Sequence, residues 1–217
     1  MFTKTLFSLL VGICSNVGAQ DVLQQSSGNS KKYMFYLHGA IVQDMGINAV
    51  SDEFGKYEYN NILDSLRRHG FVILSEVRPK GTIVEKYATK VSRQIDSLLR
   101  KGIQPENVVI VGASQGAYIA IEVANTLKNA RIKFAILALC NEYNVNYYSM
   151  YRKELCGNFL SIYEESDQKK SCMNLLSESF CKTGFKEIRL TMGNGHGFIF
   201  KPYSEWIQPL VKWVQTN

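Results

Sequence analysis

The sequence has few of the residue types and clusters that metal centres and nucleic-acid surfaces require. Its 217 residues include only three histidines and five cysteines, and no Cys-x-x-Cys or Cys/His pair has the spacing of zinc ligands. The 25 Lys and Arg residues outnumber the 19 Asp and Glu residues, but no run of five or more basic residues occurs. A nucleic-acid-binding stripe would be clustered. We therefore expect no metal, no cofactor and no nucleic-acid partner.

No apolar run near the N-terminus is long enough for an ordinary membrane span of about 20 residues. The stretch from Thr5 to about Val17 follows a lysine and ends in small residues up to Ala19. This layout is typical of a secretory signal peptide with cleavage after its small residues. We expect a signal peptide over 1–19 and a secreted or periplasmic protein without a stable membrane span. An uncleaved anchor is the alternative interpretation.

The rest of the chain has the size and composition of one globular domain. Hydrophobic residues make up 46% of the sequence, enough for a sizeable core, and the length fits one domain better than two. Residues 20–31 are polar and rich in Ser and Gln, which predicts a mobile lead-in. We expect a single domain over 32–217.

Strand-like and helix-like patterns alternate along this domain. Short apolar runs predict strands at 32–37, 71–77, 107–112, 134–140, 159–163 and 185–192. Amphipathic or capped segments predict helices at 57–70, 84–99, 115–129, 169–179 and 204–214. Alternation with near-continuously apolar strands is typical of a parallel sheet buried on both faces. The predicted fold class is α/β, with about six mainly parallel strands and helices on both faces.

The strand at 107–112 runs into Gly-Ala-Ser-Gln-Gly, which has the form G-x-S-x-G with Ser114 at its centre. A strand, this pentapeptide and then a helix is how a nucleophilic serine is mounted on a sharp turn. The glycines Gly112 and Gly116 fit because such a turn leaves no room for side chains between strand and helix. A tight crossover with a capping serine is the alternative.

A serine nucleophile needs a base, and the three histidines differ in where they lie. His69 ends a predicted helix and is interpreted as structural. His196 lies in a glycine-rich loop directly after the last strand, at the edge where parallel strands end, and is the predicted base. His38 follows the first strand and is predicted to shape its loop. That loop is also expected to supply the Ala40 N–H to an oxyanion hole, together with the N–H of Gln115.

These motifs resemble the α/β-hydrolase superfamily, and most closely its small, capless, carboxylesterase-like members. His-Gly-Ala follows an early strand, Gly-Ala-Ser-Gln-Gly forms the elbow, and Gly-His-Gly stands near the end. The resemblance implies a catalytic acid in a loop after the penultimate strand, where Asp167 matches the family's acid position. Glu165 is a near alternative, and Glu142 is another because some relatives draw the acid from the preceding strand.

The resemblance implies a serine hydrolase that cleaves a carboxylic ester or related acyl bond of a small-molecule substrate. A peptidase or a thioesterase with the same triad is the alternative within this class, and a non-catalytic binding protein is the alternative outside it. The tyrosines at 143, 147, 148 and 151 fall where relatives insert caps, and they wall either the substrate pocket or the outer surface.

Four cysteines remain after the signal peptide, an even number that suits disulfides in an oxidising compartment. In a parallel sheet Cys140 and Cys172 fall at the active-site edge, and Cys156 and Cys181 at the opposite edge. A Cys172–Cys181 bridge would have to span a predicted helix of roughly 13 Å. We therefore predict Cys140–Cys172 and Cys156–Cys181, with buried free thiols as the alternative.

Overall fold

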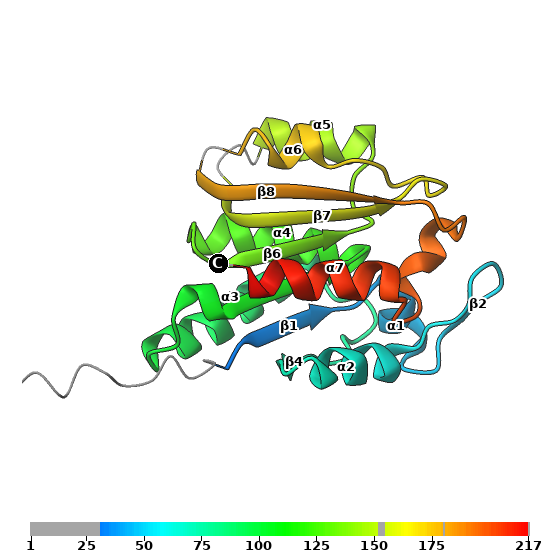
Figure 1. Cartoon of the computed structure of the whole chain (residues 1–217), viewed down its shortest axis with the longest axis horizontal. Coiled ribbons are helices and arrows are strands. Elements are labelled where there is room, and N and C mark those ends of the chain that lie inside the picture. The colour runs from blue at the N-terminus through cyan, green and yellow to red at the C-terminus, as the bar shows by residue number, and fades with distance from the viewer. Residues whose placement is uncertain (1–30, 152–154, 180, 217) are drawn as a thin grey trace, which may run out of the picture. The chain divides into compact units, whose positions relative to one another are not determined.

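A six-stranded parallel sheet forms the centre of the computed structural model, which describes residues 31–151, 155–179 and 181–216 (Figure 1). Its strands lie in the order β4-β1-β5-β6-β7-β8, and every neighbouring pair is parallel. The strands are β1 (Tyr33–Leu37), β4 (Val72–Leu74), β5 (Val108–Ala113), β6 (Lys133–Leu137), β7 (Cys156–Glu164) and β8 (Cys181–Leu190). The predicted fold class is confirmed. The predicted signal peptide, 1–19, lies outside the described residues, as does all but the last residue of the lead-in.

The strand order reverses beside β1, and this reversal places the functional edge of the sheet. The chain runs from β1 to its neighbour β4 on one side, and then crosses back to β5 on the other. In open parallel sheets, ligands bind outside the carboxyl ends of the strands at such a switch point. Leu37 of β1 pairs with Gly112 of β5, so the loops that follow these two strands emerge next to each other.

Helices cover both faces because alternate strand residues point to opposite sides. Met34 and Tyr36 join the apolar cluster formed with α2 and α7, whereas Phe35 and Leu37 join the cluster formed with α3 and α4. The helices are α1 (Ala40–Met45), α2 (Tyr59–Arg68), α3 (Val84–Arg100), α4 (Gln115–Leu127), α5 (Glu142–Tyr151), α6 (Met173–Leu176) and α7 (Ser204–Gln215). Each residue of β5 is buried, which makes it the central strand that carries the elbow.

Two elements between β1 and β4 were not predicted from the sequence. The short helix α1 follows β1, and a hairpin of β2 (Val50–Ser51) and β3 (Gly55–Lys56) projects beyond the edge where the strands end (Figure 1). Its strands are too short to give an alternating pattern.

The region between β6 and β8 differs most from the sequence-based expectation. The tyrosine-rich stretch after β6 contains α5, the predicted helix at 169–179 shrinks to the four residues of α6, and β8 begins at Cys181. Long-range contacts explain the shortened helix. The Glu187 carboxylate of β8 accepts hydrogen bonds from the Ser171 hydroxyl and the Cys172 N–H. The backbones of Lys170 and Cys140 form an isolated antiparallel β-bridge.

Both predicted disulfides are present. Cys140 and Cys172 are joined with their Cα atoms 5.2 Å apart, and Cys156 and Cys181 with theirs 4.4 Å apart. Cys156 and Cys181 are also register partners at the first residues of β7 and β8, so this bridge fastens the start of the edge strand. The predicted pairing is therefore confirmed. The long helix between Cys172 and Cys181, which the prediction assumed in order to exclude a bridge between these two residues, is not formed.

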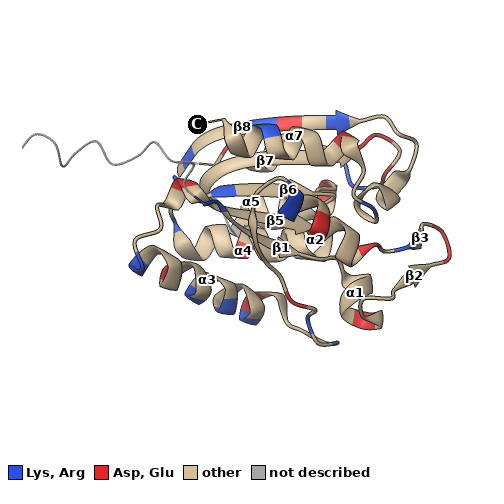
Figure 2. Cartoon of the chain, turned by 60° about the horizontal axis from the view of Figure 1, so that its bottom comes forward, with Lys and Arg blue, Asp and Glu red and all other residues tan. Residues whose placement is uncertain are grey.

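In the view of Figure 2, the positions of basic and of acidic residues are spread over many helices, strands and loops. On α3, for example, both blue and red positions occur along the helix. None of the helices in the described ranges is long and apolar enough to cross a membrane.

Candidate active site

Ser114 lies at the sharp turn between β5 and α4. Its backbone has φ 53° and ψ −116°, a conformation that non-glycine residues rarely adopt and that concentrates at functional sites. A Cβ on Gly116 would lie 1.8 Å from the Leu37 carbonyl oxygen, and one on Gly112 would lie 2.4 Å from that of Gly116. The glycines of the pentapeptide are therefore required by the close approach of β1, β5 and α4. The Ser114 N–H donates to the Leu137 carbonyl at 2.9 Å, which anchors the turn to β6.

His196 reaches Ser114 from the loop that follows β8. It lies in a short 3-10 helix, η2 (Gly195–Ile199), and its Nε2 is 3.0 Å from the Ser114 Oγ. Its other ring nitrogen, Nδ1, is 2.8 Å from the Oδ2 of Asp167. The structure thus brings together the three residues that the sequence singles out as nucleophile, base and acid.

Asp167 is almost wholly buried, whereas the other two acid candidates are exposed. Its side chain is only 4% exposed, and its second oxygen, Oδ1, accepts the Lys169 N–H at 3.1 Å. Glu165 instead forms an exposed ion pair with Arg189 on β8, at 3.4 Å. Glu142 is exposed in the first turn of α5. Of the three carboxylates, Asp167 is the one that contacts His196.

A second carboxylate, Glu164, ties the acid loop to the histidine loop, and sequence reasoning did not find it. It ends β7, is buried, and accepts hydrogen bonds from the Met192 N–H at 2.9 Å and the Gly193 N–H at 3.2 Å. Burial alone would raise the pKa of Glu164, but backbone hydrogen bonds from Met192, Ser166 and Gly193 outweigh burial and hold this pKa below its ordinary value. The Ser166 hydroxyl also accepts the Gly195 N–H at 2.9 Å. These contacts fix the position of His196 relative to Asp167.

The two predicted oxyanion donors begin two helices at the same edge of the sheet. Ala40 is the first residue of α1 and Gln115 the first residue of α4. The N–H groups of a helix's first turn have no partner within the helix, and the helix dipole there favours negative charge. Gly39 lies against Ser114, since a Cβ at Gly39 would be 3.5 Å from the Ser114 Cβ.

His38 is buried and holds the loop after β1. Its Nδ1 donates to the Gly39 carbonyl at 2.8 Å, and its Nε2 accepts the Arg78 backbone N–H at 3.0 Å. Burial, followed by the charge of Arg78, lowers the pKa of His38 from 6.5 to about 4. The ring is therefore neutral near pH 7, in agreement with its two hydrogen bonds. His69 is the C-cap of α2.

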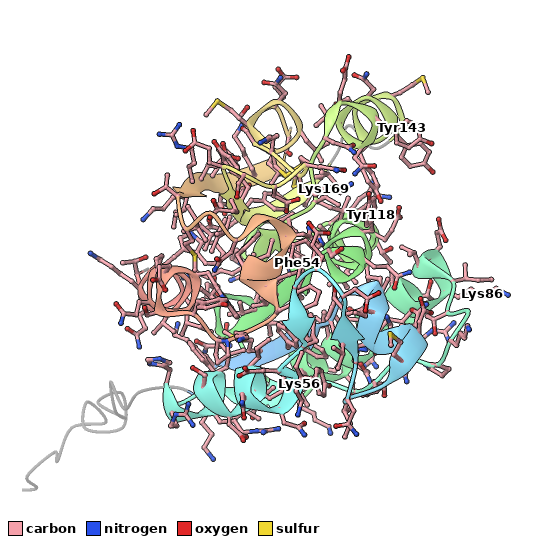
Figure 3. All side chains as sticks on the ribbon, turned by 90° about the vertical axis from the view of Figure 1, so that its right-hand side faces the viewer. Phe54, Lys56, Lys86, Tyr118, Tyr143 and Lys169 are labelled. Carbon is pink, nitrogen blue, oxygen red and sulfur yellow. A yellow bond between two sulfur atoms is a disulfide. The ribbon has the colours of Figure 1, made fainter. Side chains whose placement is uncertain are left out.

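A hollow of about 370 Å³ opens beside Ser114, and Phe54 from the β2–β3 hairpin forms part of its wall. The Phe54 ring centre is 6.4 Å from that of His196, and a Cβ on Gly197 would lie 2.8 Å from the Phe54 Cδ1. Figure 3 looks onto this edge of the molecule, with Phe54 and Lys169 near its centre. The hollow is lined by Glu53, Phe54, Ser114, Ser166, Asp167, Gln168, Lys169, Gly195 and His196.

Tyr143, Tyr147 and Tyr148, which the sequence allows either at a pocket wall or on the outer surface, do not line this hollow. Tyr143 is 74% exposed on α5, and Tyr148 is buried against Tyr118, with ring centres 6.1 Å apart. Phe54 is the aromatic residue in the wall of the hollow. Phe54 comes from a hairpin that the sequence did not predict. In the sequence, only Gly197, next to His196, indicates that a bulky side chain packs at this position. Within the described residues, no group of three or more His, Cys, Asp or Glu side chains could hold a metal ion.

Comparison with known proteins gives a family match for part of the chain. Residues 72–167 match a family model described as phospholipase/carboxylesterase. A search of curated proteins finds no match.

Solved structures with the same fold cover most of the chain at low identity. SOBER1 from Arabidopsis thaliana is 14% identical, with a TM-score of 0.52 over 86% of this chain and 100% of its own. A putative α/β-hydrolase of unknown function from Agrobacterium tumefaciens is 18% identical, with a TM-score of 0.55 over 88% of this chain and 87% of its own. A monoacylglycerol lipase from Paleococcus ferrophilus is 13% identical, with a TM-score of 0.54 over 84% of this chain and 93% of its own.

The sheet order, the elbow and these matches show that the chain has the fold of α/β hydrolases. The match to the phospholipase/carboxylesterase model further indicates a hydrolase.

Proposed function

We propose that this protein is an exported serine hydrolase that cleaves a carboxylic ester or a related acyl bond through an acyl-enzyme. One observation carries the proposal: an unbroken chain of hydrogen bonds from the Asp167 carboxylate through His196 to the Ser114 hydroxyl. The chain ends at the switch point of the sheet, beside a hollow that can hold a substrate. Nucleophile, base and orienting acid in this geometry are the parts that acyl transfer requires.

In the first half of the reaction, the Ser114 oxygen attacks the carbonyl carbon of the substrate while His196 Nε2 takes the hydroxyl proton. Asp167 accepts the Nδ1–H of His196, which keeps Nε2 free to act as a base and stabilises the imidazolium once it forms. The tetrahedral intermediate carries a negative oxygen, and the N–H groups of Ala40 and Gln115 donate to it.

In the second half, the imidazolium of His196 returns its proton to the leaving alcohol as the carbon–oxygen bond breaks. The acyl group now remains on Ser114. Water attacks this ester, His196 again takes a proton, and collapse of the second intermediate releases the carboxylic acid and restores Ser114.

Export is supported by the two disulfides, because such bridges persist in oxidising compartments and are rare in the cytosol. The N-terminal pattern over 1–19 is the further support for a secreted or periplasmic location.

A fluorophosphonate probe tests the proposal, since it reacts covalently only with an activated serine. We expect labelling of the wild-type protein, its complete loss in Ser114→Ala, and normal labelling of Ser97→Ala, a control serine on α3. A folded wild-type protein that the probe does not label would favour the non-catalytic binding function and overturn the proposal.

The same triad serves esters, thioesters and amides, so the bond cleaved needs its own assay. A panel of nitrophenyl esters of increasing acyl length, acyl thioesters and peptide anilides distinguishes an esterase from a thioesterase or a peptidase. We expect short-chain esters to react fastest because the hollow is only about 370 Å³ in volume and carries the polar residues Glu53, Ser166, Gln168 and Lys169 in its wall. A preference for thioesters or anilides would overturn the ester assignment.

A further inference from the structure

Arg78, which follows β4, is a buried guanidinium beneath the loop that carries Ala40. Arg78 is only 1% exposed to solvent. Nε donates to the Gln43 side-chain oxygen at 3.2 Å, and Nη2 donates to the His38 carbonyl. The guanidinium carbon also lies 5.6 Å from the ring centre of Tyr87.

Among the described residues, no acidic side chain pairs with Arg78 to compensate for the burial of its charge. Its hydrogen-bond acceptors are backbone carbonyls and the side-chain amides of two glutamines, and none of the ion pairs among the described residues includes it. Burying a cation without a counterion costs folding free energy. A neutral residue of similar size would avoid this cost, so the guanidinium must serve a purpose that its position can explain.

That position controls the direction of the Ala40 N–H. The Gly39 carbonyl and the Ala40 N–H belong to one planar trans peptide unit, so they point in opposite directions. The Gly39 oxygen accepts from His38 Nδ1 at 2.8 Å and from Arg78 Nη2 at 3.4 Å. With the carbonyl held on the Arg78 side, the N–H is held on the other side of the peptide. Rotation of this peptide would withdraw the donor from the oxyanion.

The same nitrogen also contacts the second donor residue. Arg78 Nη2 lies 3.2 Å from the side-chain oxygen of Gln115, whose backbone N–H is the other proposed oxyanion donor. One guanidinium nitrogen therefore links the loop after β1 to the first turn of α4. The planar guanidinium holds the donors on Nε and Nη2 in fixed directions toward these acceptors.

We infer that Arg78 is a positioning residue that fixes both oxyanion donors and places a positive charge behind them. This role rests on the proposed function of Ser114 and its oxyanion hole. Arg78 acts through the Gly39–Ala40 peptide and through Gln115, and does not itself touch the reacting atoms.

Arg78→Met and Arg78→Lys test this role, with Arg67→Met as the control. Arg67 is an exposed arginine on α2 that pairs with Asp64. Turnover is measured per active site, titrated with the fluorophosphonate, so that a loss of folded protein does not count as a loss of rate. We expect Arg78→Met to lower kcat by about 10- to 100-fold, less than the 10²- to 10³-fold that removal of a whole oxyanion donor costs. KM should change by less than about threefold, because the oxyanion exists only in the transition state.

Two further readouts separate positioning from a merely structural role. Affinity for a trifluoromethyl ketone, which forms a tetrahedral oxyanion on the serine, should fall in parallel with kcat. The kcat of Arg78→Lys should exceed that of Arg78→Met by less than tenfold, since the lysine ammonium keeps the positive charge but lacks the planar set of donors of a guanidinium.

Gln115→Met provides a test that leaves the buried guanidinium in place should Arg78→Met fail to fold. It keeps the backbone N–H but removes the acceptor of Nη2, and we expect a kcat loss of about threefold to tenfold from the loosened donor. Wild-type turnover per titrated site in Arg78→Met, or in Gln115→Met where Arg78→Met does not fold, would overturn the inference. If the wild type itself fails to react with the probe, the proposed function fails instead, so the two failures are distinguishable.

Discussion

Replacement of Asp167 by Asn tests the proposed acid with almost no change in shape. The Lys169 N–H donates to Oδ1 at 3.1 Å, so an asparagine keeps its carbonyl oxygen at that position. Its amide nitrogen then faces His196 Nδ1, where Oδ2 lies in the wild type at 2.8 Å. Nδ1 must accept a hydrogen bond, which forces the proton onto Nε2. A protonated Nε2 cannot take the proton of Ser114.

We therefore expect Asp167→Asn to lower kcat by about three to four orders of magnitude, the range expected when the orienting acid is lost. This corresponds to about 4–5.5 kcal/mol of barrier, at 1.36 kcal/mol for each tenfold change. Steady-state ester hydrolysis per titrated site measures it, with circular dichroism to verify folding. Glu165→Gln and Glu142→Gln serve as matched controls and should each cost less than about tenfold. If Glu142→Gln is the crippling change and Asp167→Asn is mild, the assignment of the acid is refuted.

Three further predictions concern the scaffold around the site. Gly116→Ala should destabilise the fold by about 3 kcal/mol in a denaturant titration, because its Cβ would meet the Leu37 carbonyl at 1.8 Å, and a stability within about 0.5 kcal/mol of wild type would contradict this packing. The folded-state pKa of His38, about 4, lies below its ordinary value of 6.5. The contribution of neutral His38 to the free energy of unfolding is therefore fully present above pH 6.5 and is lost as the pH falls toward 4. The wild type should therefore lose about 3 kcal/mol more than His38→Asn over that interval, whereas parallel losses would show that His38 titrates normally. Replacing Cys156 and Cys181 together by Ser should cost about 3 kcal/mol from the loop that the bridge closes, and an unchanged unfolding midpoint would argue against the bridge.

The sequence by itself determined the parts of the protein that depend on local patterns. Continuous apolar runs separated by amphipathic segments define a buried parallel sheet, because each strand must be covered on both faces. The sharp turn at Ser114 can be predicted from the sequence because it leaves room only for glycine two residues before and two residues after the serine. The place of His196 follows from its position just after a strand, since parallel strands end at one common edge.

Only the tertiary structure decided which side chains meet at that edge. Glu164 pairs with Leu190 in the register of β7 and β8, and this register sets which carboxylate of the acid loop faces the histidine loop. The sequence leaves Glu165 and Asp167 as alternatives because a two-residue difference in a loop has no periodic pattern to resolve it.

Phe54 and Arg78 were invisible for a related reason. Phe54 reaches the site on a hairpin whose strands have only two residues each, and Arg78 looks like an ordinary charged residue after a strand. Their roles arise from contacts with residues distant in the chain, Gly197 for Phe54 and Gln115 for Arg78. Such contacts depend on how the strands pack side by side, which local propensity does not encode.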